Sequence, residues 1–208
     1  IPPAVLAQLR NDPLFLQPLA SAYAAVGRGA EAQPTLERAL KQRFPADVKG
    51  LKTDIEIQLA GMLASANHLD QAGDRYKQVL AEEPGSLPAW QGLVRIQHAM
   101  GHDAEALETV HGMPPATYAA AMRDTSFEIA VASIYEAEKK LDVAQDILQK
   151  AVTEQTNAGQ KPSPAIEMQL AGLYIERGNP QLAYPVYQQV IHENPDRADA
   201  WAGLLSAL

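Results

Sequence analysis

The sequence predicts an all-α protein, an α-solenoid built from antiparallel helix pairs. Three observations predict this fold class: a pattern of small and apolar residues that recurs every 34 residues, glycines and prolines that divide each unit into two helices, and helix-start signals where the units begin. The composition is compatible with a buried core, because 47% of the 208 residues are hydrophobic and only 20% are charged.

The repeated units define the domain organisation. Five full units of 34 residues can be aligned and a partial sixth follows them: 13–46, 53–86, 87–120, 125–158, 164–197 and 198–208. The twentieth position of every full unit is alanine: Ala32, Ala72, Ala106, Ala144 and Ala183. A small side chain there lets two antiparallel helices approach closely, while larger side chains fill the space around it. We therefore expect residues 1–208 to form a single solenoid.

Glycine and proline mark the helix ends within the units. Gly27, Gly101 and Gly178 occupy equivalent positions, where the first helix is expected to stop and the chain to turn. Pro84 and Pro195 are expected to end the second helix of their units.

Helix-start signals agree with these units. Asp12 and Ser163 each precede a proline, which predicts an N-cap followed by proline at the first helical position. The segments 53–56 and 125–128 begin with threonine and place glutamate three residues later, which predicts capping boxes.

The third unit departs from the pattern. Its second helix, from about Asp103 to Val110, is interrupted at Gly112–Pro115, and a short helix is expected over Ala116–Arg123. Two interpretations stay open: a local distortion of the array, or a hinge or docking corner between two halves.

Both ends of the chain resemble interior parts of an array. The segment Ala198–Leu208 supplies a first helix, and no second helix follows to cover its apolar side chains. The segment Ile1–Asp12 is expected to be the remnant of a preceding helix. We therefore expect a fragment of a longer array, able to self-associate through exposed terminal helices.

Composition excludes several classes of function. The absence of cysteine excludes disulfides, thiolate metal sites and a cysteine nucleophile. A formal net charge of −8 disfavours binding to nucleic acid. No apolar run approaches the roughly 18 residues that a membrane span requires, so direct membrane insertion is not expected.

Two short motifs are compatible with chemistry but are better explained by the repeat. Gly27–Ala32 matches a loose GxGxxA pattern, yet a predicted helix precedes it where a dinucleotide site needs a strand. His98 and His102 have a spacing that can share a metal on one helix, but Gly101 is expected to end the helix between them. We expect no catalytic residue, no cofactor and no metal.

The units resemble the tetratricopeptide repeat, a helix–turn–helix unit of 34 residues. The first unit carries LxxLAxxY from Leu16, and the third and sixth open with Trp90-x-x-Leu93 and Trp201-x-x-Leu204. The resemblance implies a right-handed superhelix whose first helices line a concave groove that binds a protein or peptide. Mapped onto this sequence, the groove residues implied are Gln17, Ser21, Gln58, Gly61, Gln91, Arg95, His98, Ser133, Glu136, Gln169, Gly172 and Glu176.

The implied groove has little positive charge. Family members that grip a C-terminal carboxylate use several cationic side chains, whereas only Arg95 is cationic here, so acidic tails are not expected partners. Gly61, Gly92 and Gly172 either leave room for an extended chain or relieve packing between neighbouring helices, and both interpretations stay open.

The first functional hypothesis is a non-enzymatic scaffold that holds a partner segment in the groove, and the alternative is a structural spacer between domains outside this segment. The alanine-rich array also resembles the tetratricopeptide stalks of bacterial envelope machines, among them the periplasmic region of cellulose-export subunits. That resemblance is carried by PPATY at 114–118 and the AWxGL openings at 89–93 and 200–204. It implies cellulose biosynthesis and the periplasm, while compartment and partner stay open.

Overall fold

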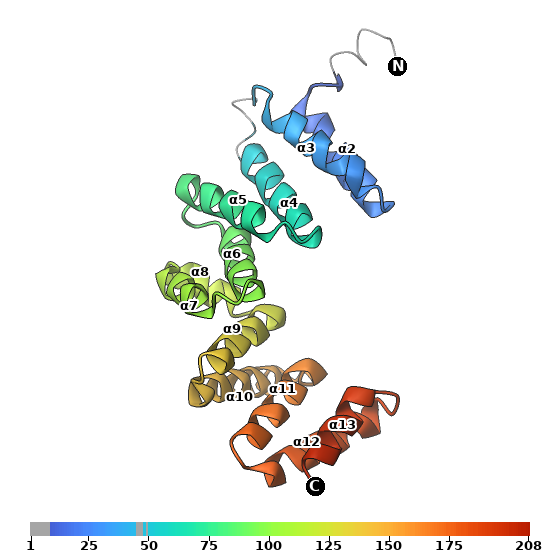
Figure 1. Ribbon diagram of the computed structural model, residues 1–208, viewed down its shortest axis with the longest axis vertical. Helices are drawn as coiled ribbons and strands as arrows, with labels where there is room; N and C mark the ends of the chain where they lie inside the picture. The colour runs from blue at the N-terminus through green and yellow to red at the C-terminus, as the bar shows by residue number, and fades with distance from the viewer. Residues whose placement is uncertain (1–8, 45–47, 49) are drawn as a thin grey trace. The chain divides into compact units, whose positions relative to one another are not determined.

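The computed structural model describes residues 9–44, 48 and 50–208 (Figure 1). These residues form twelve helices, labelled α2 to α13, and no strand. The chain divides into two compact units, Ile1–Gly101 and His102–Leu208. The division lies inside the third predicted repeat, between its first and second helices.

The first unit contains the helices of the first two repeats and the first helix of the third. They are α2 (Pro13–Ala25), α3 (Gly29–Leu40), α4 (Leu51–Ser65), α5 (Leu69–Glu82) and α6 (Leu87–Ala99). Each packs on the next, and the first helices α2, α4 and α6 also contact their nearest counterparts. One apolar core runs through them, from Leu16 on α2 to Ile96 on α6.

The second unit begins with the second helix of the third repeat. Its helices are α7 (Asp103–Gly112), α8 (Pro115–Ala121), α9 (Thr125–Ala137), α10 (Leu141–Asn157), α11 (Pro164–Glu176), α12 (Pro180–Glu193) and α13 (Ala198–Ser206). From α9 onward each helix packs on the next, and α11 also contacts α9 and α13. The predicted interruption of the third repeat is confirmed, because α7 ends at Gly112 and a short helix starts at Pro115.

The small residues of the repeat lie in the buried core. The alanine at the twentieth position is completely buried in all five repeats. The alanine at the eighth position, present in four repeats, is equally buried: Ala20, Ala60, Ala132 and Ala171. Their burial agrees with the close helix packing expected at these positions.

The turn inside each repeat has one backbone conformation. Gly27, Gly101 and Gly178 have φ of 77°, 75° and 75°, as their predicted role requires. Asn67 and Lys139 occupy the same position in the other two repeats, with φ of 62° and 59°. The turn therefore takes the left-handed conformation even where the sequence offers no glycine.

The predicted helix starts are right in two cases and wrong in two. Asp12 accepts a hydrogen bond from the backbone N–H of Leu14 (2.9 Å), and Ser163 precedes Pro164 at the start of α11. The capping box at Thr53 is wrong, because α4 already starts at Leu51 after Gly50 in the left-handed region. The capping box at 125–128 is displaced by one residue, because Asp124 accepts from the N–H of Ser126 (2.9 Å).

The two threonines have a different role from the one predicted. Thr53 Oγ1 donates to Glu83 Oε1 (2.6 Å), and Thr125 Oγ1 accepts from Gln155 Nε2 (3.2 Å). Both contacts join the first residue of a repeat to its thirty-first. The hydroxyl thus holds the end of the second helix against the start of the first.

One tryptophan contact occurs once in each unit. Trp90 Nε1 donates to the carbonyl oxygen of Pro84 (2.7 Å), and Trp201 Nε1 donates to that of Pro195 (2.9 Å). Each bond ties the first helix of a repeat to the proline that follows the second helix of the preceding one.

Most of the predicted helix over Ile1–Asp12, residues 1–8, lies outside the described residues.

Candidate partner-binding face

The twelve residues predicted to line the groove all lie on first helices, and we call this set the first-helix face. Every one of them is half-buried or exposed. Its members on α2, α4 and α6 belong to the first unit, and those on α9 and α11 belong to the second.

In the first unit, the first-helix face contains a hydrogen-bonded chain between two repeats. Gln58 Nε2 on α4 donates to Ser21 Oγ on α2 (2.9 Å), and Ser21 Oγ donates to the backbone oxygen of Gln17 (3.1 Å). The structure therefore brings Gln17, Ser21 and Gln58 together. Gln91, Arg95 and His98 lie on α6 of the same unit.

The second unit repeats this link at equivalent positions. Gln169 Nε2 on α11 donates to Ser133 Oγ on α9 (2.8 Å) and lies 3.4 Å from Glu136 Oε2. Glu176 forms an ion pair with Lys139 in the turn after α9 (3.2 Å between Oε1 and Nζ). Glutamine at the sixth position and serine at the ninth position of the preceding repeat thus connect neighbouring first helices in both units.

A hollow of about 710 Å³ lies beside this chain in the first unit. Two residues of the first-helix face, Gln58 and Gly61, contribute to its wall. None of its lining residues carries a charge: Ala24, Gly27, Gly29, Ala30, Gln33, Gln58, Gly61, Met62, Ser65 and Ala66. The hollow is therefore bounded by small and neutral side chains.

Two interpretations were open for Gly61, Gly92 and Gly172, and the structure shows which of these glycines packing requires. A Cβ on Gly92 would lie 2.3 Å from the ring of Tyr76, so this glycine serves the packing of α5 on α6. A Cβ on Gly61 or Gly172 would meet only a tyrosine hydroxyl, at 3.9 and 4.0 Å, which is an ordinary contact. Packing does not require glycine at these two positions.

A set of buried carboxylates was missed by sequence reasoning. Glu56, Glu128 and Glu167 each occupy the fourth position of a repeat, and Glu56 and Glu128 are only 6% exposed. That shared position was the signal that could have identified them. Desolvation raises the pKa of all three carboxyls.

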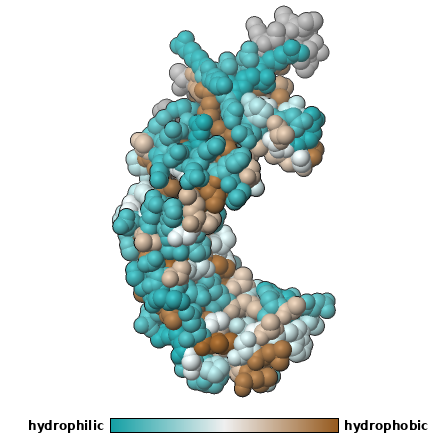
Figure 2. Space-filling model, viewed as in Figure 1, coloured by the Kyte–Doolittle hydropathy of each residue, from teal (hydrophilic) through white to brown (hydrophobic). Residues whose placement is uncertain are grey.

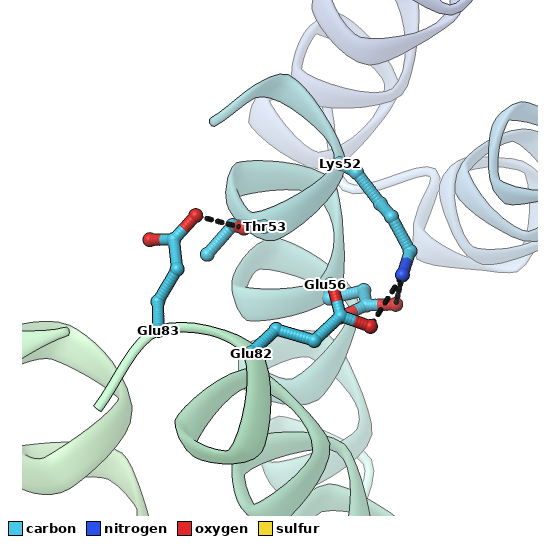
Figure 3. Close-up of polar contacts among 5 residues, drawn as sticks. All are labelled: Lys52, Thr53, Glu56, Glu82 and Glu83. Atoms are coloured by element: carbon cyan, nitrogen blue, oxygen red, sulfur yellow. Dashed lines mark hydrogen bonds and ion pairs between the residues drawn. The ribbon is translucent and has the colours of Figure 1, made fainter. Parts of the chain in front are cut away.

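A second glutamate, from the end of the second helix, faces each buried carboxylate. In the first unit Lys52 Nζ lies 2.6 Å from Glu82 Oε1 and 3.8 Å from Glu56 Oε1, and so neutralises part of this pair (Figure 3). Glu193 likewise pairs with Lys161 (2.7 Å) and raises the pKa of Glu167. These contacts join the two helices of one repeat and place no carboxylate pair in the hollow described above.

The motifs set aside at the sequence level are parts of the repeat. Gly27 forms the turn after α2, and Gly29 begins α3. His98 lies on α6 and His102 immediately precedes α7, so they do not share a helix. Within the described ranges, no group of three or more potential ligands is arranged to hold a metal ion.

An exposed apolar surface covers the end of α13. Trp201, Leu205 and Leu208 are 48%, 70% and 85% exposed, and hydrophobic colour gathers there in Figure 2. Among the helices described, none has the length and apolar character to span a membrane.

The repeat geometry agrees with the family to which the sequence belongs. The sequence model of the tetratricopeptide repeat family matches residues 63–124 and 135–208. The chain belongs to the tetratricopeptide repeat family, whose members typically act as non-enzymatic scaffolds for protein partners. The predicted fold class, an all-α repeat solenoid, is confirmed.

Two bacterial proteins are similar in sequence over most of the chain. Cellulose synthase 1 operon protein C of Komagataeibacter xylinus is 24% identical over 185 residues, which are 88% of this chain. Cellulose synthase operon protein C of Pseudomonas fluorescens is 27% identical over 182 residues, or 84% of the chain. The chain spans only 13% of the length of each relative.

Solved structures share the fold. A tetratricopeptide repeat protein from Parabacteroides merdae superposes with a TM-score of 0.76 at 14% identity, over 94% of this chain and 72% of that one. MamA from Desulfovibrio magneticus gives a TM-score of 0.72 at 15% identity, over 89% and 97%. At these identities the likeness establishes the fold alone.

Proposed function

We propose that this chain is a non-enzymatic scaffold that holds a segment of a partner protein on its first-helix face. The observation that carries the proposal is the hollow lined in part by Gln58 and Gly61, two residues of the first-helix face. Neighbouring first helices are joined there by side-chain hydrogen bonds, so the surface is held in place before a partner arrives.

The setting of this scaffold is proposed from the two sequence relatives. Both are named for a cellulose synthase operon. We therefore propose that the partner belongs to a bacterial cellulose synthesis or export complex, with the periplasm as the compartment. The chain covers 13% of each relative, so most of each relative has no counterpart in this chain. The partner itself therefore has to be identified by experiment.

In-cell photo-crosslinking tests the proposal in the full-length native protein. A photo-reactive residue replaces exposed Glu176 on α11, and the matched control carries it at exposed Gln188 on α12. Glu176 is preferred to Ser133, because Ser133 holds the hydrogen bond from Gln169. The first unit is tested in the same way, with exposed Arg95 on α6 and its control Gln78 on α5.

A scaffold is expected to give one discrete adduct from the first-helix positions and none from the controls. Identification of that adduct as a cellulose synthesis or export protein would support the proposed setting. Equal labelling from both sides, or none, would contradict a dedicated partner-binding face.

The alternative is a spacer that sets the distance between other parts of a longer protein. Such a spacer would be one part of a longer protein, and the chain spans 13% of the length of each relative. A spacer predicts that the crosslinking positions give no specific adduct, while removal of one whole repeat still impairs the full-length protein.

A further inference from the structure

Two equivalent tyrosines occupy narrow spaces between glycines on neighbouring first helices. In the first unit, Tyr76 on α5 lies against Gly61 on α4 and Gly92 on α6. In the second unit, Tyr187 on α12 lies against Gly172 on α11 and Gly203 on α13. We call these two groups the glycine–tyrosine slots.

The geometry of the slots is nearly the same. A Cβ on Gly92 or Gly203 would lie 2.3 Å from the tyrosine ring, so the ring lies flat against the backbone of that helix. On the other side, Gly61 and Gly172 meet the hydroxyl at 3.9 and 4.0 Å from an ideal Cβ. Each hydroxyl therefore lies beside Gly61 or Gly172, which contributes no side chain, while the ring fills the space over Gly92 or Gly203.

Neither slot hydroxyl has a hydrogen-bond partner within the described residues, although Tyr76 and Tyr187 are only 7% and 4% exposed. The hydroxyls of Tyr135, Tyr174 and Tyr184, by contrast, bond to His111, Gln149 and Gln188.

Fully buried side-chain polar atoms without a partner occur, in the described ranges, only on Glu56, Gln97, Glu167 and Gln169. The slot hydroxyls are not among these atoms, so each one reaches the surface. A hydroxyl that reaches the surface without a partner in the chain can bond to a ligand in place of water.

The chemistry of a tyrosine hydroxyl restricts what that ligand is. Burial raises the pKa of both tyrosines, so each stays protonated at neutral pH. A neutral hydroxyl donates one hydrogen bond and accepts others, and so it can meet either the N–H or the C=O of a peptide group. The glycine beside the hydroxyl, Gly61 or Gly172, permits a backbone to approach closely, as a side chain there would not.

We propose that each glycine–tyrosine slot receives the main chain of an extended partner peptide, with the tyrosine hydroxyl bonded to one of its backbone amides. This inference rests on the proposed function and names the class of segment that the first-helix face takes. In the first unit, Gly61 also lines the uncharged hollow. The cationic side chain of Arg95 acts on the Tyr76 hydroxyl and partly offsets the effect of burial on its pKa, so a positive charge lies near this slot.

A library of short peptides displayed on phage and selected against the 208-residue chain supplies the probe. A selected peptide is then synthesised, and its Kd is measured against Tyr76→Phe and Tyr187→Phe. Loss of one hydrogen bond is expected to weaken binding about three- to tenfold in the variant whose slot is occupied. Tyr184→Phe is the matched control, and it should leave the Kd unchanged.

A backbone substitution in the peptide tests the main-chain contact directly. Each peptide amide is replaced in turn by an ester, which removes the N–H and weakens the carbonyl acceptor. One ester is expected to reproduce the loss seen with the phenylalanine variant, and the two changes together should cost no more than either alone.

The outcomes separate this inference from the function on which it rests. Enrichment of no peptide would contradict peptide binding itself, and the slot proposal would fall with it. Binding that is unchanged in both phenylalanine variants would overturn the slots alone and leave the scaffold standing. Thermal melts of both variants check the fold, which should be unaffected because the tyrosine ring is retained.

Discussion

Gly92 and Gly61 lie on neighbouring first helices and contact the same tyrosine, yet alanine should affect them in opposite ways. Gly92→Ala places a methyl group inside the ring of Tyr76 and should destabilise the fold by about 1–3 kcal/mol. Gly61→Ala meets only the hydroxyl at an ordinary distance, and helix propensity should stabilise the fold by up to about 1 kcal/mol. Urea denaturation of both variants checks this, and equal losses would contradict the packing described.

The buried carboxylates make stability depend on pH. Burial raises the pKa of Glu128, and Glu154 and Asp124 reinforce that effect while Lys150 opposes it. A raised pKa in the folded protein gives stability that is complete below the unfolded pKa and is lost as pH rises through the folded one. The same sign applies to Glu56 and Glu167.

Glu128→Gln should therefore reduce the fall in thermal stability between mildly acidic and neutral pH. The reason is that glutamine keeps the shape of the protonated carboxyl and cannot ionise. Melting temperatures measured across this pH range provide the check, with exposed Glu108→Gln as the control. A pH profile identical to that of the parent would contradict the assignment.

Single residues were predictable from the sequence where the repeat constrains them directly. Ala183 and Gly178 follow from the small size and left-handed turn that their positions demand. The slot tyrosines did not follow, because the repeat pattern predicts that Tyr76 is buried and does not reveal which glycine its ring covers. The pairing of Gln169 with Ser133 was also missed, since periodicity identifies a face and not its hydrogen bonds.

At the scale of the helix pair, close approach depends on the alanine at the twentieth position. Ala183 on α12 is completely buried, and neighbouring Leu182 is 48% exposed. Ala183→Trp should separate α11 from α12 and cost about 1–3 kcal/mol or more, whereas Leu182→Trp should cost little. A thermal melt unchanged by Ala183→Trp would contradict the repeat register.

Helix boundaries were the least predictable elements. The α4 helix starts two residues before Thr53, because Gly50 adopts a left-handed conformation that a capping pattern does not reveal. The register of the repeats is more strongly constrained by the sequence, since it depends on many positions in each repeat and not on a single cap.

At the scale of the whole molecule, the apolar surface of α13 is expected to determine how copies of the chain behave in solution. Leu205 and Leu208 are mostly exposed, so the 208-residue chain is expected to self-associate. Glutamate at both positions should return it to a monomer in sedimentation velocity, and glutamate at exposed Gln189 should not. A parent chain that is monomeric at every concentration would contradict this expectation.

The tryptophan–proline bonds have a further consequence, because the chain contains only two tryptophans. Trp90 belongs to the first unit and Trp201 to the second, and each donates to an equivalent proline carbonyl. Replacing either tryptophan with phenylalanine leaves the other as an optical reporter of its own unit. Coincident unfolding midpoints from the two variants would mean that the array melts as one cooperative body, and separate midpoints would mean that it melts in two steps.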